Sequence, residues 1–263
     1  MTTCFSLLGL VLMVLAPASA AAAFLPFDQV SIQSVDEATQ HNAIGLAKAN
    51  TNDWDGAIAE YSEAIRLDPN FADAFYNRGL AREEKGNLDD AIQDFSRAIA
   101  LNPRHALAYT ERGMMLADKN EWDRAIEDFS KALAIDPTDA STYRGRGNAR
   151  SGKGDLDGAI ADLTASLGLY PKSAGVYTDR ANVKLKKKDL AGAAADYDAA
   201  ITINPAYPRA YYGRAIMKID RRDLDGAIAD LNQTITLDPK AVDAYTQRGH
   251  GQSPRLCSGP RSA

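Results

Sequence analysis

Prolines recur at intervals of 34 through most of this 263-residue chain. They stand at Pro69, Pro103, Pro137, Pro171, Pro205 and Pro239. The nonapeptide DLDGAIADL follows the same interval, because its two copies begin at Asp155 and Asp223, which are 68 residues apart. Self-similarity at a fixed period of this size is typical of arrays built from one repeated supersecondary unit. The spacing therefore predicts a linear stack of equivalent units.

We number the positions of the unit from 1 to 34, starting at Ala38, so that the proline is at position 32. Position 8 is always Gly or Ala, position 20 is always Ala, and position 24 is aromatic or Leu. Each unit has two blocks of apolar residues spaced three or four apart, which predicts two amphipathic helices. Between the blocks, Gly86, Asn120 and Gly154 suit a left-handed helix end. The acidic residues after this turn suit the start of the second helix, and the proline ends that helix. They are Asp53, Glu121, Asp155, Asp189 and Asp223.

This pattern resembles the tetratricopeptide repeat, in a variant with Asn-Arg-Gly at residues 77–79. The resemblance implies an all-α protein, a right-handed α-solenoid of helix-turn-helix repeats. It covers six units, at 38–71, 72–105, 106–139, 140–173, 174–207 and 208–241, and the start of a seventh at 242–249.

In this family the first helices line a concave groove that holds a partner segment, so the resemblance also implies the binding residues. Position by position, we expect the following residues in the groove: Phe71, Tyr76, Leu80, Thr110, Met114, Arg144, Asn148, Thr178, Asn182, Tyr212 and Ile216. The alternative is that some of them only pack on neighbouring units. The Lys/Asn/Arg clamp with which some family members bind a terminal carboxylate is not matched, because Asp179 stands where the clamp needs Asn.

A second set of residues forms what we call the arginine–carboxylate ladder. Position 7 is Arg in every unit after the first, and position 23 is always acidic. If each acid pairs with the Arg of the following unit, 18 residues further on, all members are used and none is left over at either end. We therefore predict structural salt bridges between units. The predicted pairs are Glu60–Arg78, Asp94–Arg112, Asp128–Arg146, Asp162–Arg180, Asp196–Arg214 and Asp230–Arg248.

Catalytic chemistry is not indicated. The sequence GNARSGKG at 147–154 resembles a phosphate-binding loop but lacks the Ser or Thr after its Lys and the preceding strand. His41, His105 and His250 are scattered, so we expect no catalytic residue, metal or cofactor. The net charge of −5 argues against nucleic acid as a partner.

The chain begins with an uncharged apolar stretch followed by Ala-Ser-Ala at 18–20. This order is typical of a secretory signal peptide at 1–23, cleaved after Ala20 or Ala23, and predicts a periplasmic or secreted protein. The alternative is an uncleaved membrane anchor, since the apolar stretch is long enough to span a bilayer. We expect an irregular lead-in at 24–37, with a first helix starting at the Ser34–Glu37 capping box.

At the other end, Gly251, Pro254, Gly259 and Pro260 predict an aberrant or disordered tail at 250–263. The hypothesis that fits all of this is a non-catalytic scaffold of the cell envelope that binds a partner protein or peptide. Two alternatives stay open: the repeat part of a larger truncated envelope enzyme or assembly factor, and a structural protein that self-associates through an uncapped C-terminal end.

Overall fold

The computed structural model describes residues 27–256, which form thirteen α-helices and no strand. The signal peptide, its cleavage sites and both cysteines lie outside the described residues. The helices are α1 (Phe27–Ala49), α2 (Trp54–Leu67), α3 (Ala72–Glu84), α4 (Leu88–Leu101), α5 (Ala106–Asp118), α6 (Trp122–Ile135), α7 (Ala140–Lys153), α8 (Leu156–Leu169), α9 (Ala174–Lys186), α10 (Leu190–Ile203), α11 (Pro208–Asp220), α12 (Leu224–Leu237) and α13 (Val242–Leu256). The predicted all-α solenoid is confirmed, with one helix pair per unit.

The repeated nonapeptide begins the second helix of its unit. In the first copy, the Asp155 carboxylate accepts a hydrogen bond of 3.0 Å from the backbone N–H of Gly158, which caps α8. The equivalent bonds in other units also end on a glycine, namely Gly56, Gly192 and Gly226. Where that glycine is replaced, by Asp90 in α4 and Arg124 in α6, no side-chain cap forms. A Cβ at Gly158 would lie 2.2 Å from the capping carboxylate, so the cap requires glycine there.

The turn inside each unit is left-handed at position 15, as predicted for Gly86, Asn120 and Gly154, whose φ angles are 78°, 60° and 94°. The same conformation occurs at Lys188 and Arg222, with φ of 66° and 61°. A side chain with Cβ is strained in this region, and only Gly, Asn and Asp adopt it readily. Position 15 therefore takes one backbone shape whatever residue is present.

The core of each unit is a close approach between its two helices. Phe95 and Phe129 at position 24 are fully buried, and each ring lies against the glycine at position 8 of its own unit. A Cβ at Gly79 would lie 2.7 Å from the Phe95 ring, so the small residue is needed for the ring to fit. The alanines at position 20 are buried to 1% exposure or less.

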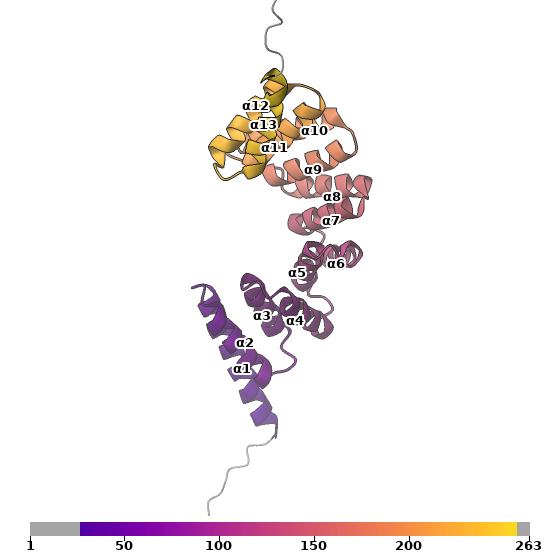
Figure 1. Cartoon of the computed structure of the whole chain (residues 1–263). Helices are drawn as coiled ribbons and strands as arrows, with labels where there is room; N and C mark the ends of the chain where they lie inside the picture. The colour runs from indigo at the N-terminus through magenta and orange to yellow at the C-terminus, as the bar shows by residue number, and fades with distance from the viewer. Residues whose placement is uncertain (1–26, 257–263) are drawn as a thin grey trace, which may run out of the picture.

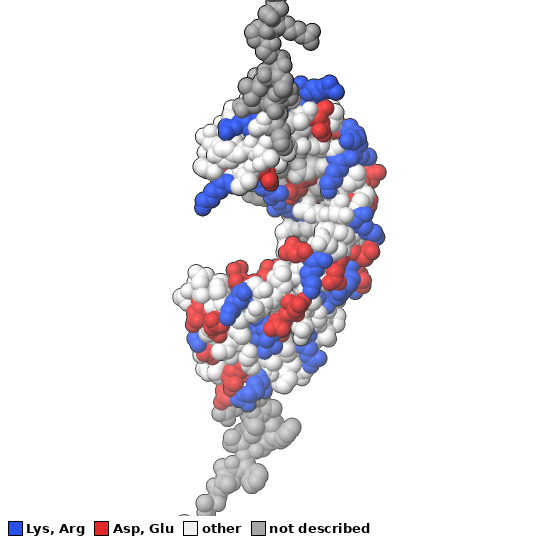
Figure 2. Space-filling view, viewed as in Figure 1, with Lys and Arg blue, Asp and Glu red and all other residues white. Residues whose placement is uncertain are grey.

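The stack is curved, with the first helices on the inner side. Several successive first helices contact each other (α1–α3, α5–α7, α7–α9 and α9–α11), whereas contacts of this size do not occur between described second helices. Figure 1 shows the helix pairs stacked from α1 and α2 at one end to α12 and α13 at the other. Figure 2 shows the hollow that results on the inner side, with acidic side chains along its border near the N-terminal units. We call this hollow the concave groove.

The ladder forms, but the predicted pairing between units is wrong. Each Arg at position 7 binds the Asp of its own unit, 16 residues further on, through Nε and Nη2. In the second unit, Arg78 donates to the two carboxylate oxygens of Asp94 at 2.9 and 2.7 Å. The same two-pronged pairing is found in Arg112–Asp128, Arg146–Asp162, Arg180–Asp196 and Arg214–Asp230.

The ends of the array explain why counting partners gave the wrong register. Glu60 does not bind Arg78 but is held by His41 and Lys48 of its own first helix, at 2.7 and 2.6 Å. Arg248 does not reach Asp230 and donates instead to Asn232 at 2.9 Å. Both terminal members thus have local partners, so a complete set of pairs did not require the link between units.

A different bond of the same arginines joins neighbouring units. The Nη1 of Arg78 donates to Ser62 at 3.1 Å, and Arg112 donates to Ser96 at 2.9 Å, which is position 25 of the preceding unit. The guanidinium also lies over the aromatic ring three residues earlier, for example 5.5 Å from the Phe75 ring centroid. One arginine therefore fixes both the helix pair and its stacking on the previous unit, because its planar fork offers donors in several directions.

Both ends are more helical than expected. Helix α1 begins at Phe27, so residues 27–37 are helical rather than irregular and the helix does not start at Ser34. Helix α13 continues to Leu256, so 250–256 is not an irregular tail. Pro254 stands in the last turn of α13, where the loss of one backbone hydrogen bond disturbs the least helix. Ala244 of α13 is fully buried against α11 and α12, so the sixth unit is covered and not left uncapped.

Candidate partner-binding groove

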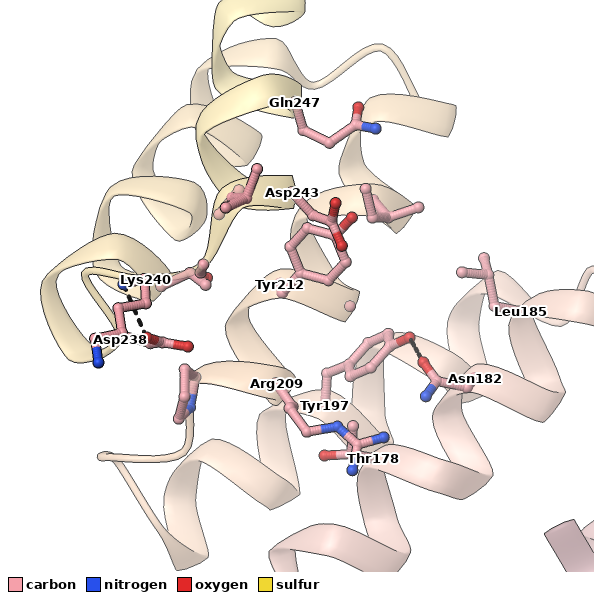
Figure 3. A pocket seen from close by; sticks show the side chains of 17 residues that line it. Thr178, Asn182, Leu185, Tyr197, Arg209, Tyr212, Asp238, Lys240, Asp243 and Gln247 are labelled. Atoms are coloured by element: carbon pink, nitrogen blue, oxygen red, sulfur yellow. Dashed lines mark hydrogen bonds between the residues drawn. The ribbon is translucent and has the colours of Figure 1, made fainter. Parts of the chain in front are cut away.

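The C-terminal part of the concave groove contains a cavity of about 910 Å³ between α9, α11 and α13. We call it the C-terminal cavity. It brings together four of the predicted binding residues, Thr178, Asn182, Tyr212 and Ile216. Figure 3 shows them on α9 and α11, with Tyr212 beside Asp243 of α13 and Arg209 close to Thr178. The site thus needs three successive first helices, including that of the incomplete seventh unit.

Asn182 is positioned by the core of the fifth unit. The buried Tyr197 hydroxyl donates to Asn182 Oδ1 at 2.6 Å, and burial raises the pKa of Tyr197 to about 12. The phenol is therefore a permanent donor at neutral pH. Because Oδ1 is used in this bond, the two N–H groups of the Asn182 amide are left to donate to a ligand, and a peptide carbonyl is a suitable acceptor.

Charge in this half of the groove is balanced around one carboxylate. Asp179 on α9 is only 7% exposed and accepts a 2.7 Å hydrogen bond from Arg144 Nε of α7. Arg209 of α11 lies 3.9 Å from the other Asp179 oxygen. Arg144 is thus committed to Asp179, while Arg209 remains largely exposed at the cavity. Asn148, the remaining predicted residue on α7, is exposed outside this cavity.

A smaller pocket of about 230 Å³ lies at the N-terminal end of the groove, between α1, α2 and α3. We call it the N-terminal pocket. Its apolar lining includes Leu46, Ala49, Trp54 and the predicted binding residue Leu80. Glu83 is part of the same lining.

Tyr76, also predicted, is half-buried beside Leu80 on α3. Its ring centroid lies 5.8 Å from that of Phe95 and 4.6 Å from that of His105. Burial raises the pKa of Tyr76 to about 12, with a contribution from the charges of Glu111 and Glu83. Burial also lowers the pKa of His105, so this imidazole is neutral at pH 7.

The other predicted groove residues have structural contacts. Thr110 is only 3% exposed, and its hydroxyl is shared with Thr142 at 2.7 Å and with the Ala106 carbonyl at 3.3 Å. Thr178 is 1% exposed and its hydroxyl donates to the Ala174 carbonyl, so it forms the floor of the cavity rather than a contact group. Met114 packs between Phe95 and Phe129, and Phe71 is the residue before α3. For the two threonines, packing rather than binding is the outcome.

Sequence reasoning missed the groove residues at positions 6 and 13. The positions chosen from the family were 2, 5, 9 and 12, yet a helix of 3.6 residues per turn also presents 6 and 13 on that face. Gln247 at position 6 of α13 lines the C-terminal cavity, and Glu84 at position 13 of α3 lines the N-terminal pocket. The helical periodicity would have found them.

No group of acidic, histidine or cysteine side chains suited to hold a metal occurs among the described residues. The sequence that resembles a phosphate-binding loop lies inside α7, except for its last glycine, so it has no loop with which to surround a phosphate. Within residues 27–256, no helix has both the length and the apolarity required to cross a bilayer.

The chain belongs to the tetratricopeptide repeat family. Family profiles described as TPR repeat and Tetratricopeptide repeat match residues 45–86, and residues 82–140, 144–210 and 178–242, respectively. Proteins of this kind are interaction scaffolds, and the repeat fold is generally non-catalytic. No curated protein matches the chain in sequence.

Solved structures share the fold at low sequence identity. The chain is similar to the crystal structure of the APC/C hetero-tetramer Cut9-Hcn1, with a TM-score of 0.69 and 19% identity over 85% of this chain, but it spans only 45% of that chain. It is similar to pilF of Pseudomonas aeruginosa, with a TM-score of 0.69 and 17% identity over 83% of this chain and 99% of that one. YrrB, described as a TPR protein with an unusual peptide-binding site, gives a TM-score of 0.58 and 17% identity, covering 72% and 97% of the two chains.

Proposed function

We propose that this protein is an exported scaffold of the cell envelope that holds an extended segment of a partner protein in its concave groove. The observation that carries the proposal is the C-terminal cavity, which is large enough for several side chains of an extended segment. Pockets that bind ligands are concave and mainly apolar, with a few polar groups that orient the ligand. Here Leu185 and Ile216 supply apolar surface, and Asn182 supplies amide donors.

The rigidity of the scaffold supports binding without rearrangement. The ladder and the helix–helix cores hold the first helices in register, so a segment that enters the groove meets preformed contacts. Preformed sites lower the entropic cost of binding. The fold of YrrB, whose structure is described as having a peptide-binding site, is consistent with this use of the groove.

Capture from an envelope extract tests the proposal. The full chain is compared with the double variant Arg209→Glu/Asp243→Lys, which changes two cavity-lining residues that are exposed and outside the core. The control is Asp90→Lys/Lys172→Glu, which has the same net charge but changes exposed residues away from the cavity. We expect a partner that is retained by the parent and the control and lost with the cavity variant. Equal retention by all three would place the partner elsewhere.

Export is tested separately, by determining the N-terminal residue of the chain recovered from the medium or periplasm of a bacterial host. The sequence favours export because an uncharged apolar stretch precedes Ala-Ser-Ala at 18–20. A new N-terminus at Ala21 or Phe24 would support it. Recovery of the uncleaved chain from the membrane fraction would favour anchoring, and recovery from the cytosol would contradict export.

A further inference from the structure

The N-terminal part of the concave groove carries carboxylates without counter-ions. Glu83 and Glu84 of α3 and Glu111 and Asp118 of α5 form no ion pair or hydrogen bond with any other described residue. Acidic residues on the second helices differ, since their carboxylates are bound by a lysine of the following unit. These pairs are Asp55–Lys85, Asp89–Lys119, Asp123–Lys153 and Asp157–Lys187.

Apolar surface is exposed in the same region. Leu46 at the N-terminal pocket is 43% exposed, and Leu107 at position 2 of α5 is 54% exposed. The pocket itself is lined mainly by apolar groups, with Glu83 and Glu84 among its lining residues. An exposed apolar patch with a charged border is typical of a protein-binding surface. The charge on that border selects the kind of partner.

The charges around Glu111 are all of one sign. Burial, together with Glu83 of α3 and Asp139 before α7, raises the pKa of Glu111 to about 7. Burial raises the pKa of Glu83 as well, with contributions from Glu84 and Asp118. The fold thus holds carboxylates in partly buried places where no cation offsets the cost.

The cations nearest this region are already bound. Arg78 and Arg82 of α3 pair with Asp94 of α4, and Arg112 of α5 pairs with Asp128 of α6. Arg144 of α7 pairs with Asp179, and neutral His105 stacks on Tyr76 with Nε2 3.6 Å from Asp73. The missing positive charge must therefore come from outside the described chain.

We propose that the N-terminal part of the groove binds a partner segment in which a leucine-sized side chain enters the N-terminal pocket and neighbouring lysine or arginine side chains meet Glu83 and Glu111. This inference rests on the proposed function, because it assigns the chemistry of the segment held in the concave groove. A lysine suits the site since its alkyl stem packs on apolar surface while its ammonium reaches a carboxylate. Here Tyr76 and Met114 supply that surface.

Binding of a cation favours the ionised form of Glu111, so the complex forms with release of a proton. Affinity for a basic segment then increases as the pH rises through 7, the pKa of Glu111 in the free protein. A simple apolar pocket would show no such dependence. The pH profile therefore separates charge recognition from general stickiness.

The test uses the full chain and a fluorescent, C-terminally amidated decapeptide of leucine, lysine and glycine. Two matched peptides replace the lysines by glutamate or the leucines by serine. Fluorescence anisotropy at pH 8 should show binding of the lysine–leucine probe about tenfold tighter than of either matched peptide. Glu83→Gln/Glu111→Gln should weaken the probe about tenfold, and Asp90→Asn, an exposed acid on α4, should not. Between pH 8 and pH 6 the parent should lose about threefold or more in affinity, and the double variant should not.

Equal affinity for the glutamate peptide, no effect of Glu83→Gln/Glu111→Gln, or a flat pH profile would each overturn the proposal. Circular dichroism on both variants verifies that they fold. If the basic probe does not bind but a partner is captured and lost with Arg209→Glu/Asp243→Lys, this inference fails and the proposed function stands. If capture also fails, the proposed function itself is wrong.

Discussion

The two halves of the concave groove are built on one repeated helix pair but differ in how their charges are satisfied. In the N-terminal half, Glu83 and Glu111 are partly buried without cations, and their pKa values are raised. In the C-terminal half, the most buried groove acid, Asp179, is bound by Arg144. The repeat therefore fixes the position of a groove residue and leaves its chemistry open. Function in such a protein is contained in the positions that do not repeat.

The halves also differ in the strain of their turns. Position 15 is Asn52, Gly86 and Asn120 in the first three units, all residues that tolerate a left-handed backbone. In the last two units it is Lys188 and Arg222, which do not. We therefore expect the C-terminal half to be the first to open, because stability in solenoids is close to a sum over units and interfaces.

The largest effect is expected where the two halves share the ladder. Asp162→Ala leaves Arg146 and Arg150 without the buried carboxylate that both bind, at 2.7 and 2.8 Å. Loss of one partner of a buried pair costs about 3–5 kcal/mol, and urea unfolding followed by circular dichroism measures it. Asp157→Ala removes an exposed partner of Lys187 and should leave the transition almost unchanged. A small effect of Asp162→Ala would show that the ladder does not hold the units.

Much of this architecture could be predicted from the sequence. The period of 34, the small residues at positions 8 and 20, and the left-handed turns at Gly86, Asn120 and Gly154 follow from local chemistry that each unit repeats. The members of the ladder were predicted, but their pairing was not. Intervals of 16 and 18 residues are both consistent with a periodic sequence, and only the direction of the side chains decides between them.

The groove was less predictable. The sequence gives the helix face but not the burial of each residue, so Thr110 and Tyr76 were treated alike although only one has a free side chain. The raised pKa of Glu111 depends on burial and on Asp139, 28 residues away in the chain, and neither is visible in a local pattern. The ends failed for a related reason, since α13 is stabilised by packing on α12 despite unfavourable residues near its C-terminal end.

Glu111→Gln should sharpen the contrast in charge. Folding raises the pKa of Glu111 from 4.5 to about 7, so its contribution to stability is fully present below pH 4.5 and is lost as the pH rises through 7. We expect the variant to be more stable than the parent at pH 8 by about 1–3 kcal/mol and nearly equal to it at pH 5. Urea unfolding at both values provides the measurement. A difference independent of pH would mean that the carboxylate is solvated.

Asn182→Ala tests the hydrogen bond that positions the C-terminal cavity. The variant leaves the buried Tyr197 hydroxyl without its acceptor, which costs about 1–3 kcal/mol. The double variant Asn182→Ala/Tyr197→Phe removes both groups, so it should recover part of that loss. Thermal unfolding of the single and double variants measures the coupling. If the double variant is less stable than either single variant by the sum of both effects, the bond does not contribute.

The smallest effect should come from relieving the strained turns. Lys188 and Arg222 have φ near +60°, and a glycine there avoids the contact between Cβ and the backbone. Each of Lys188→Gly and Arg222→Gly should stabilise the chain by about 0.5–1 kcal/mol, because the relief of about 1–2 kcal/mol is partly offset by the greater freedom of glycine in the unfolded chain. The matched change Gly86→Ala, at the same position of the second unit, should destabilise it by a similar amount. Hydrogen exchange should show slower opening of α9–α13 in the two glycine variants and no change in α1–α4. Equal slowing throughout would mean that the two halves unfold as one unit and that the difference in their turns does not control where opening begins.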